Sequence, residues 1–274
     1  MPVRSPAPVP RWLPAGSVQV TQYARGVLVL LPPSETKADG GRGGPLDLDA
    51  LSFPELNPTR AKLADALTEL AADVPASIAV LGLTERQAGE VARNARLWRS
   101  PTMPALRRYT GVLYDALDVK SFTRAGLEKA HRRLAVTSSL FGVVSATDPI
   151  PAYRLSGGTA LPSLGPVRGL WKPVLEPVLK GVEGLVVDLR SGTYAAFAKL
   201  RPDAVTVRVV TESAHGERVT VSHFNKAYKG RLARVLVTTR AEPSTVDQLV
   251  KVIRKAGLVV ERTGDHALDL VTEG

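Results

Sequence analysis

The order of hydrophobic and polar positions divides this chain into a short first strand, a helical middle and a second half where strands and helices alternate. Val27–Leu31 is an apolar run that ends at Pro32-Pro33, which is typical of a buried strand stopped by residues that cannot extend its ladder. Residues 1–26 contain five prolines and show neither a helical nor a strand period. We therefore expect residues 1–26 to be a flexible, proline-rich N-terminal extension.

Helical patterns follow the first strand. Asn57-Pro58 reads as a cap with proline at the first helical position, and leucines at helical spacing come after it. Thr84 and Gln87 form a capping box, which predicts a helix running to Trp98. Two more helices are predicted at residues 110–118 and 123–134.

The second half predicts a sheet assembled from distant segments. Strands are expected at 185–189, 205–210 and 219–222 with a turn at 215–217, helices at 225–239 and from Ser244 to Gly257, and two closing strands around 263–265. These patterns indicate a mixed α/β (α+β) fold. Residues 27–274 are expected to form a single compact domain, with a mixed sheet flanked by helices.

Composition narrows the class of protein. The 274 residues include 36 Lys and Arg against 26 Asp and Glu, a net charge of +10 that favours polyanionic partners such as nucleic acid. The chain has no cysteine, which excludes disulfides and thiolate chemistry, and its four histidines are not closely paired. No apolar run approaches the ~18 residues that span a bilayer. We expect a cytoplasmic monomer with no cofactor, no metal and no membrane partner.

The segment 145–155 carries the clearest candidate for recognition. Pro149 and Pro151 stiffen the backbone ahead of Tyr153 and Arg154. Arginine offers a planar fork of donors that suits phosphate, and tyrosine adds a face for stacking. The alternative is a structural ion pair between this arginine and a carboxylate such as Asp148 or Asp188.

Two further groups of cations are candidates for contacting a polyanion. Arg93, Arg96 and Arg99 recur every three residues on a predicted helix. Residues 223–240 include Lys226, Lys229 and Arg231 and no acidic residue, so the start of that helix is a candidate anion site. A solvated basic helix face explains the same pattern equally well.

Other motifs are weaker. A glycine between apolar residues at Gly82 resembles the turn of a helix-hairpin-helix, although a plain connection between two helices explains it better. The glycine-rich stretch 39–44 lacks the spacing of a phosphate-binding loop. Asp188 and Glu35 are catalytic candidates because polar groups at strand ends often face a crevice, and Ser191, Tyr194 and His223 could join Asp188. No G-x-S-x-G nucleophile elbow is present.

The ordered set of motifs resembles the YaaA family of bacterial peroxide-stress proteins. The matching pieces are Leu-Pro-Pro-Ser-Glu-Thr-Lys (31–37), Tyr-Thr-Gly-Val-Leu (109–113), Leu-Phe-Gly-Val-Val (140–144), Pro-Ala-Tyr-Arg-Leu (151–155), Leu-Trp (170–171), Val-Val-Asp-Leu-Arg-Ser-Gly-Thr-Tyr (186–194) and His-Phe-Asn-Lys-Ala-Tyr-Lys-Gly-Arg (223–231).

This resemblance implies a compact α/β domain with a basic cleft that binds DNA and limits oxidative damage. It implies that Tyr153, Arg154, Lys226 and Lys229 line or flank the cleft, and that the Gly82 turn corresponds to a helix-hairpin-helix-like element. Family members often carry a lysine where Glu35 falls here, and they begin close to the first strand.

Two functions follow as hypotheses. The first is a DNA-binding protein of the peroxide-stress response with low sequence specificity, whose phosphate contacts come from the lysines and arginines above. The alternative is an enzyme that cleaves the N-glycosidic bond of a nucleobase or nucleoside in the same cleft, with Asp188, Tyr153, Arg154 and Glu35 lining the pocket.

Overall fold

A central parallel strand organises the molecule. The computed structural model describes residues 26–212, 218–219 and 222–273, without the side chains of 212, 218–224 and 273. The first strand, β1 (Val27–Leu31), is buried along its whole length because its five apolar side chains face packed layers on both sides. The expected N-terminal extension, apart from Gly26, and the expected turn at 215–217 lie outside the described residues.

The main sheet is mixed and runs in the order β11-β12-β9-β8-β1-β3-β4, with β10 paired to β9. Strands β3, β1, β8, β9 and β12 are mutually parallel, whereas β4 and β11 are antiparallel edges. The bounds of the remaining strands are β3 (Leu134–Ser138), β4 (Gly142–Ser145), β8 (Leu185–Asp188), β9 (Val205–Glu212), β10 (Arg218–Val219), β11 (Val259–Gly264) and β12 (Ala267–Glu273). Two short ladders pair β2 (Met103–Pro104) with β5 (Pro149–Ile150) and β6 (Ala160–Leu161) with β7 (Gly165–Pro166).

Helices cover the sheet and form a second group beside it. The α-helices are α1 (Asn57–Leu70), α2 (Val74–Leu81), α3 (Gly89–Ala95), α4 (Ala105–Arg108), α5 (Val112–Leu117), α6 (Arg124–Arg133), α7 (Val167–Lys180), α8 (Gly192–Ala195), α9 (Ser222–Thr238) and α10 (Val246–Lys255). Short 3-10 turns occupy Leu48–Ala50, Pro54–Leu56, Glu85–Gln87 and Val119–Ser121. None of the helices in the described segments is both long and apolar enough to cross a membrane.

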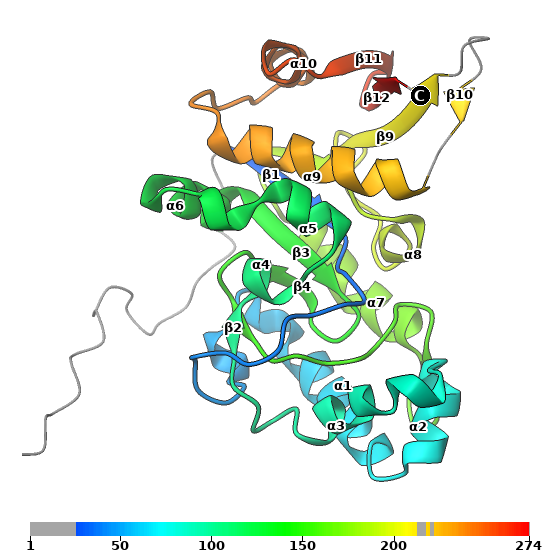
Figure 1. Cartoon of the computed structure of the whole chain (residues 1–274). Coiled ribbons are helices and arrows are strands. Elements are labelled where there is room, and N and C mark those ends of the chain that lie inside the picture. The colour runs from blue at the N-terminus through cyan, green and yellow to red at the C-terminus, as the bar shows by residue number, and fades with distance from the viewer. Residues whose placement is uncertain (1–25, 213–217, 220–221, 274) are drawn as a thin grey trace, which may run out of the picture.

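The layers place the ends of the parallel strands between two groups of helices. Figure 1 shows α5, α6 and α9 stacked in front of β1 and β3, with α1, α2 and α3 grouped at the other end of the molecule. Helices α5 and α9 approach so closely that a Cβ added at Gly230 would lie 2.1 Å from the Leu113 carbonyl oxygen. Only glycine fits there, because any side chain would collide with backbone.

Several predicted elements are confirmed with small changes of boundary. The capping box of Thr84 and Gln87 is present, but it opens a 3-10 turn, and α3 ends at Ala95 instead of running to Trp98. The predicted helix of 225–239 is α9 and starts at Ser222. Thr245, one residue after the expected Ser244, caps α10.

Buried arginines join the loops that surround the strand ends. Arg108 donates to the carbonyl oxygens of Ile150, Gly40, Pro101 and Ala38, and its side chain is fully buried. These bonds join the loop after β1 to the segment that leads into Tyr153. The two segments can therefore present their side chains to a common site.

Candidate functional site

The connections that leave β1 and β8 run in opposite directions along the sheet. The chain leaves β1 toward β3 on one side, whereas it leaves the neighbouring β8 toward β9 on the other. In α/β sheets, such a switch point opens a crevice at the carboxyl ends of the strands, where ligands bind. The loops that start here are residues 32–37 and residues 189–191, so their side chains are the first candidates for a site.

Lys37 lies at this edge with its side chain buried in the protein. It is 6% exposed, and its Nζ donates to the carbonyl oxygens of Ser34 at 3.0 Å and Glu35 at 3.4 Å. No carboxylate in the described residues lies within ion-pairing distance of this amine. Burial lowers the pKa of Lys37 to about 7, opposed chiefly by the charge of Glu35. A large fraction of the molecules therefore carries a neutral amine here at neutral pH.

Aromatic rings surround the Lys37 amine. Its Nζ lies 4.1 Å from the centre of the Tyr153 ring and 5.5 Å from that of Tyr109. A ring face attracts a cation, but here the loss of water around the amine outweighs this attraction. Burial also raises the pKa values of Tyr109 and Tyr153, so both phenols stay protonated and act as hydrogen-bond donors.

A directed chain of hydroxyls runs through the same cluster. Ser138 Oγ accepts backbone N–H bonds from Leu140 and Phe141 and lies 2.8 Å from the Tyr153 hydroxyl. Because both lone pairs of Ser138 are occupied, its own proton goes to Tyr153. Tyr153 in turn donates to the Tyr109 hydroxyl at 2.9 Å. The chain ends at Tyr109, which is buried and whose own O–H proton is not used in this chain.

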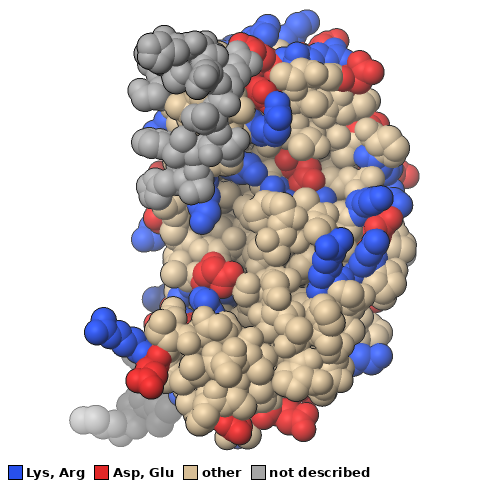
Figure 2. Space-filling model, turned by 90° about the vertical axis from the view of Figure 1, so that its right-hand side faces the viewer, with Lys and Arg blue, Asp and Glu red and all other residues tan. Residues whose placement is uncertain are grey.

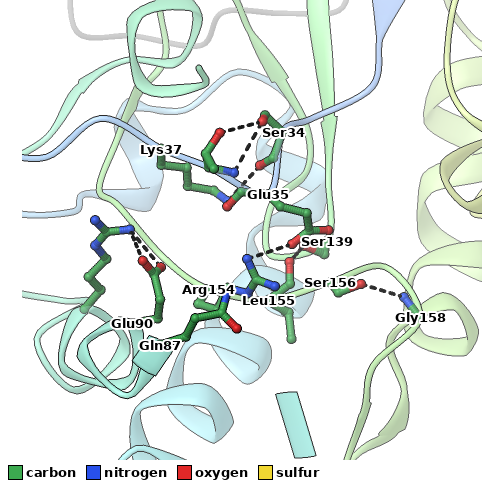
Figure 3. A network of polar contacts seen from close by, with 12 residues as sticks. Ser34, Glu35, Lys37, Gln87, Glu90, Ser139, Arg154, Leu155, Ser156 and Gly158 are labelled. Atoms are coloured by element: carbon green, nitrogen blue, oxygen red, sulfur yellow. Dashed lines mark hydrogen bonds and ion pairs between the residues drawn. The ribbon is translucent and has the colours of Figure 1, made fainter. Parts of the chain in front are cut away.

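Arg154 forms the outer side of the site. Asn94 holds its backbone by accepting from the Arg154 N–H and donating to its carbonyl oxygen, each at 2.8 Å. The Arg154 Nη1 lies 3.4 Å from Glu35 Oε2, and the two side chains are 16% and 49% exposed (Figure 3). The alternative partners considered for this arginine, Asp148 and Asp188, are wrong, because the carboxylate beside it is that of Glu35.

The guanidinium of Arg154 is incompletely satisfied. Its Nε is buried and has no hydrogen-bond partner, the one such side-chain atom in the part of the chain that the structure describes. A buried donor without a partner costs free energy, so it marks either strain or a missing ligand.

Asp188 is held by its own neighbour. Arg190 donates to both of its carboxylate oxygens at 2.9 Å, and the two side chains are 12% and 2% exposed. Lys229 from α9 donates to the Arg190 carbonyl oxygen at 3.1 Å. Burial lowers the pKa of Lys229, and Asp188 opposes the shift. This cluster belongs to the same edge because β8 is the neighbour of β1.

The other α9 cations point in more than one direction. Lys226, one turn before Lys229, is exposed. Arg231 is exposed and its guanidinium lies 4.9 Å from the centre of the Tyr228 ring. The side chain of His223 is outside the described residues. Tyr194 is buried near the site, where burial raises its pKa and Tyr153 and Glu35 add to the shift.

Arg93 approaches the site from α3 in the second group of helices, whereas Arg96 and Arg99 lie beyond the end of α3 at Ala95, so the three do not share one helix as predicted. Arg93 pairs with Glu90 and with Asp39, each at 2.7 Å. Figure 3 shows Glu90 and Arg154 beside each other, with Lys37 and Glu35 of the loop after β1 above them in the view. Arg93, Arg96 and Arg99 also line a depression of about 320 Å³.

Charges of both signs gather at this side of the molecule. Figure 2 shows Lys and Arg side chains around a hollow near the middle of the face, with acidic side chains among them. In the described segments, no three His, Asp or Glu side chains cluster as metal ligands would.

The main functional candidate that sequence reasoning missed is Lys37. Its signal was its place near the end of an apolar strand, directly after a proline-stiffened loop. Nothing in the composition indicated that this one lysine among many would be buried beside Tyr109 and Tyr153.

Comparisons with known proteins give the family. The family model described as "Peroxide stress protein YaaA" matches residues 27–263. A UPF0246 protein of Corynebacterium glutamicum is 48% identical over 244 residues, which cover 88% of this chain and 97% of that protein. UPF0246 proteins of Corynebacterium efficiens and Streptomyces coelicolor are 48% and 44% identical, each over 239 residues that cover 86% of this chain and 95% and 92% of theirs. The chain therefore belongs to the YaaA family of peroxide stress proteins, which supports a role in the oxidative-stress response.

Proposed function

We propose that this protein binds DNA in the oxidative-stress response, with little base specificity, through cations around the switch point of its sheet. The observation that carries the proposal is convergence. Arg93 from α3, Arg154 from the 151–155 segment and Lys229 from α9 are far apart in sequence, and they contact Asp39 and Glu35 of the loop after β1 and Arg190 of the loop after β8, respectively. Such a cluster offers phosphates both forks and point charges.

Residues at the ends of β1 and β8 lie between Lys229 and Arg154. Lys229 bonds the Arg190 carbonyl oxygen, and Arg190 Nη1 reaches the Tyr194 carbonyl oxygen at 3.4 Å. The charge of Glu35 contributes to the raised pKa of Tyr194, and Glu35 pairs with Arg154. A DNA backbone that lies along this edge meets cations from both helical groups. The exposed Lys226 extends the same path along α9.

Glu35 and Glu90 limit the affinity of the cleft for DNA in this proposal. Glu35 pairs with Arg154, and Glu90 together with Asp39 pairs with Arg93, so these carboxylates compete with phosphate for the two arginines. Both pairs are partly exposed to solvent, at 16% and 49% for Arg154 and Glu35 and at 22% and 24% for Arg93 and Glu90, so a phosphate can reach and compete with them. Affinity then depends strongly on salt, because each phosphate contact releases counterions.

The α2–α3 connection is a second contact point in this proposal. Gly82 ends α2 in the left-handed conformation with φ +62°, and the Leu83 N–H closes the turn on the Ile78 carbonyl oxygen at 2.9 Å. Gly82 is exposed, and the chain enters the next helical segment at once. Backbone amides at such a joint can hold a phosphate, as in a helix-hairpin-helix.

The test is the salt dependence of duplex binding. We expect Lys226→Ala together with Lys229→Ala to flatten the log–log salt slope by roughly two units, with similar losses on unrelated sequences. Fluorescence anisotropy with two duplexes of different sequence measures both quantities. Lys255→Ala, at the exposed end of α10, is the matched control and should keep the parent slope. An unchanged slope in the double variant would remove these lysines from the interface.

Cleavage of an N-glycosidic bond is the second candidate function. It is favoured by the meeting of Tyr153, Arg154 and the half-exposed Glu35 at a strand edge. Asp188 supports it less, because Arg190 already occupies both of its oxygens. Release of free base from damaged duplexes or nucleosides, abolished in Glu35→Gln or Asp188→Asn, would establish this activity.

A further inference from the structure

We propose that Lys37 is a Schiff-base nucleophile that attacks the C1′ aldehyde of an abasic site in DNA. The inference rests on the proposed DNA binding and adds a substrate class and a reaction to the same site. An abasic sugar in its open form exposes an aldehyde, the functional group that condenses with a neutral lysine amine.

The surroundings of Lys37 match the needs of such a nucleophile. Its amine meets two backbone carbonyls and two ring faces and has no carboxylate partner in the described residues. A structural lysine in a protein interior is normally paired, because an unpaired buried charge is costly. Burial also holds the pKa of Lys37 near 7, which keeps much of the amine neutral and reactive.

The loop after β1 controls access to the amine. Lys37 is covered by its own loop, and the outer side of that loop carries Glu35 paired to Arg154 at 3.4 Å. A phosphate beside the abasic sugar takes the edge of the Arg154 guanidinium that carries the unpartnered Nε, in a bidentate contact with Nε and one terminal nitrogen. Glu35 is then released, the loop loses its outer attachment, and the sugar reaches Nζ. DNA binding thus opens the site that the chemistry needs.

The reaction balances with the groups present. The Lys37 nitrogen attacks C1′ to give a carbinolamine, which expels water as the C=N bond forms, with Tyr109 O–H at the end of the hydroxyl chain as the nearby donor. Glu35, the carboxylate that acts most strongly on Lys37, takes a proton from C2′. The C3′–O bond breaks and the 3′ phosphate leaves. Water hydrolyses the imine, which restores the lysine and frees an unsaturated aldehyde.

Borohydride trapping tests this step. We expect the full-length protein, mixed with a labelled duplex that holds one abasic site and sodium borohydride, to form a covalent complex, because the imine is reduced to a stable amine. Lys37→Met should lose the complex, and Lys255→Met should keep it. Peptide mass spectrometry of the parent complex should find the sugar on residue 37.

The outcomes separate the inference from the function on which it rests. Absence of binding to an intact duplex contradicts the proposed DNA binding itself. Binding to intact duplex with no trapped complex, or with the sugar on another lysine, overturns the role of Lys37 alone. If Lys37→Met does not fold, as judged by its melting transition, the test is the residue to which the sugar is attached in the trapped complex of the parent protein. Attachment to residue 37 supports the proposal, and attachment elsewhere overturns it.

Discussion

Two buried cations of this protein, Arg60 and Lys37, sit in opposite kinds of environment. Arg60 is fully buried and donates to the carbonyl oxygens of Phe141, Ser52 and Val143 and to Asn57 Oδ1, at 2.7 to 3.0 Å. Lys37 is nearly as buried, but it has two backbone acceptors and aromatic rings. The first cation is saturated by hydrogen bonds, and the second is not.

The difference in hydrogen bonding suits Arg60 to a structural role and Lys37 to a functional one. A saturated cation joins segments and resists change, and Arg60 does so between the start of α1 and the residues around β4. Beside it, the buried carboxylate of Asp148 accepts from Ser52 Oγ, Ser52 N–H and Ser145 N–H. An unsaturated amine keeps the capacity to react or bind, at a cost in stability. Substitutions at each cation test this contrast.

The largest effect is expected for Arg60→Met. It leaves three buried carbonyl oxygens without their donor and removes the positive charge that acts on Asp148. Breaking a buried network of this kind costs about 3–5 kcal/mol. Urea unfolding measures it, with the exposed Arg86→Met expected to stay within about 0.5 kcal/mol of the parent. A loss below about 1 kcal/mol would contradict the saturated-network interpretation.

Lys37→Met should change the pH dependence of stability instead. The pKa of Lys37 is about 7 in the folded protein and 10.5 without burial, so between these values the unfolded chain binds more protons. The free energy of unfolding of the parent therefore rises with pH relative to the variant, by about 2 kcal/mol between pH 7 and 9. Urea titrations of both proteins at each pH supply the difference. Parallel curves would show that the amine is ordinary.

Asp148→Asn should reveal a smaller effect of the opposite sign. Burial raises the pKa of Asp148 to about 6 from 3.8, although three hydrogen bonds and Arg60 oppose the shift. Between these values the folded protein binds more protons, so the free energy of unfolding falls as pH rises. Relative to the variant, the parent should lose about 2 kcal/mol between pH 4 and 6 and become level above about pH 7. A difference that is constant over this interval would place the folded pKa near its ordinary value.

Local pattern accounted for much of the fold. The apolar run of β1, the proline-started α1 and the closing strands β11 and β12 are all where their spacing predicted. These elements depend on short-range signals, such as caps, turns and the regular spacing of apolar residues. The fold class and the single mixed sheet followed from their order.

Elements without such signals were missed. Helix α7 contains Pro173 and Pro177, which argue against a helix in any local reading, yet it runs unbroken from Val167 to Lys180. Its apolar face carries Trp171, whose ring packs on Gly142 of β4 and whose Nε1 donates to the Ser139 carbonyl oxygen at 2.7 Å. The free energy gained by packing the apolar face outweighs the cost of the backbone hydrogen bonds that Pro173 and Pro177 cannot donate.

The candidate site divides in the same way. Tyr153, Arg154 and Lys229 could be chosen from sequence, because residue type and a stiff or basic context suggested anion recognition. The identity of their neighbours could not. Glu35 and Arg154, or Lys37 and Tyr109, are brought together by strand register and by the bonds of Arg108, which no local spacing records.

The classes of element, their order, the excess of positive charge and the absence of thiol chemistry can be read from the order of residues. Which cations are exposed, which are saturated, and which amine in the described part of the chain lacks a carboxylate partner depend on the folded arrangement, because burial and pairing are properties of contacts between distant segments. A lysine has the same chemistry everywhere in the sequence, and only its surroundings set its charge.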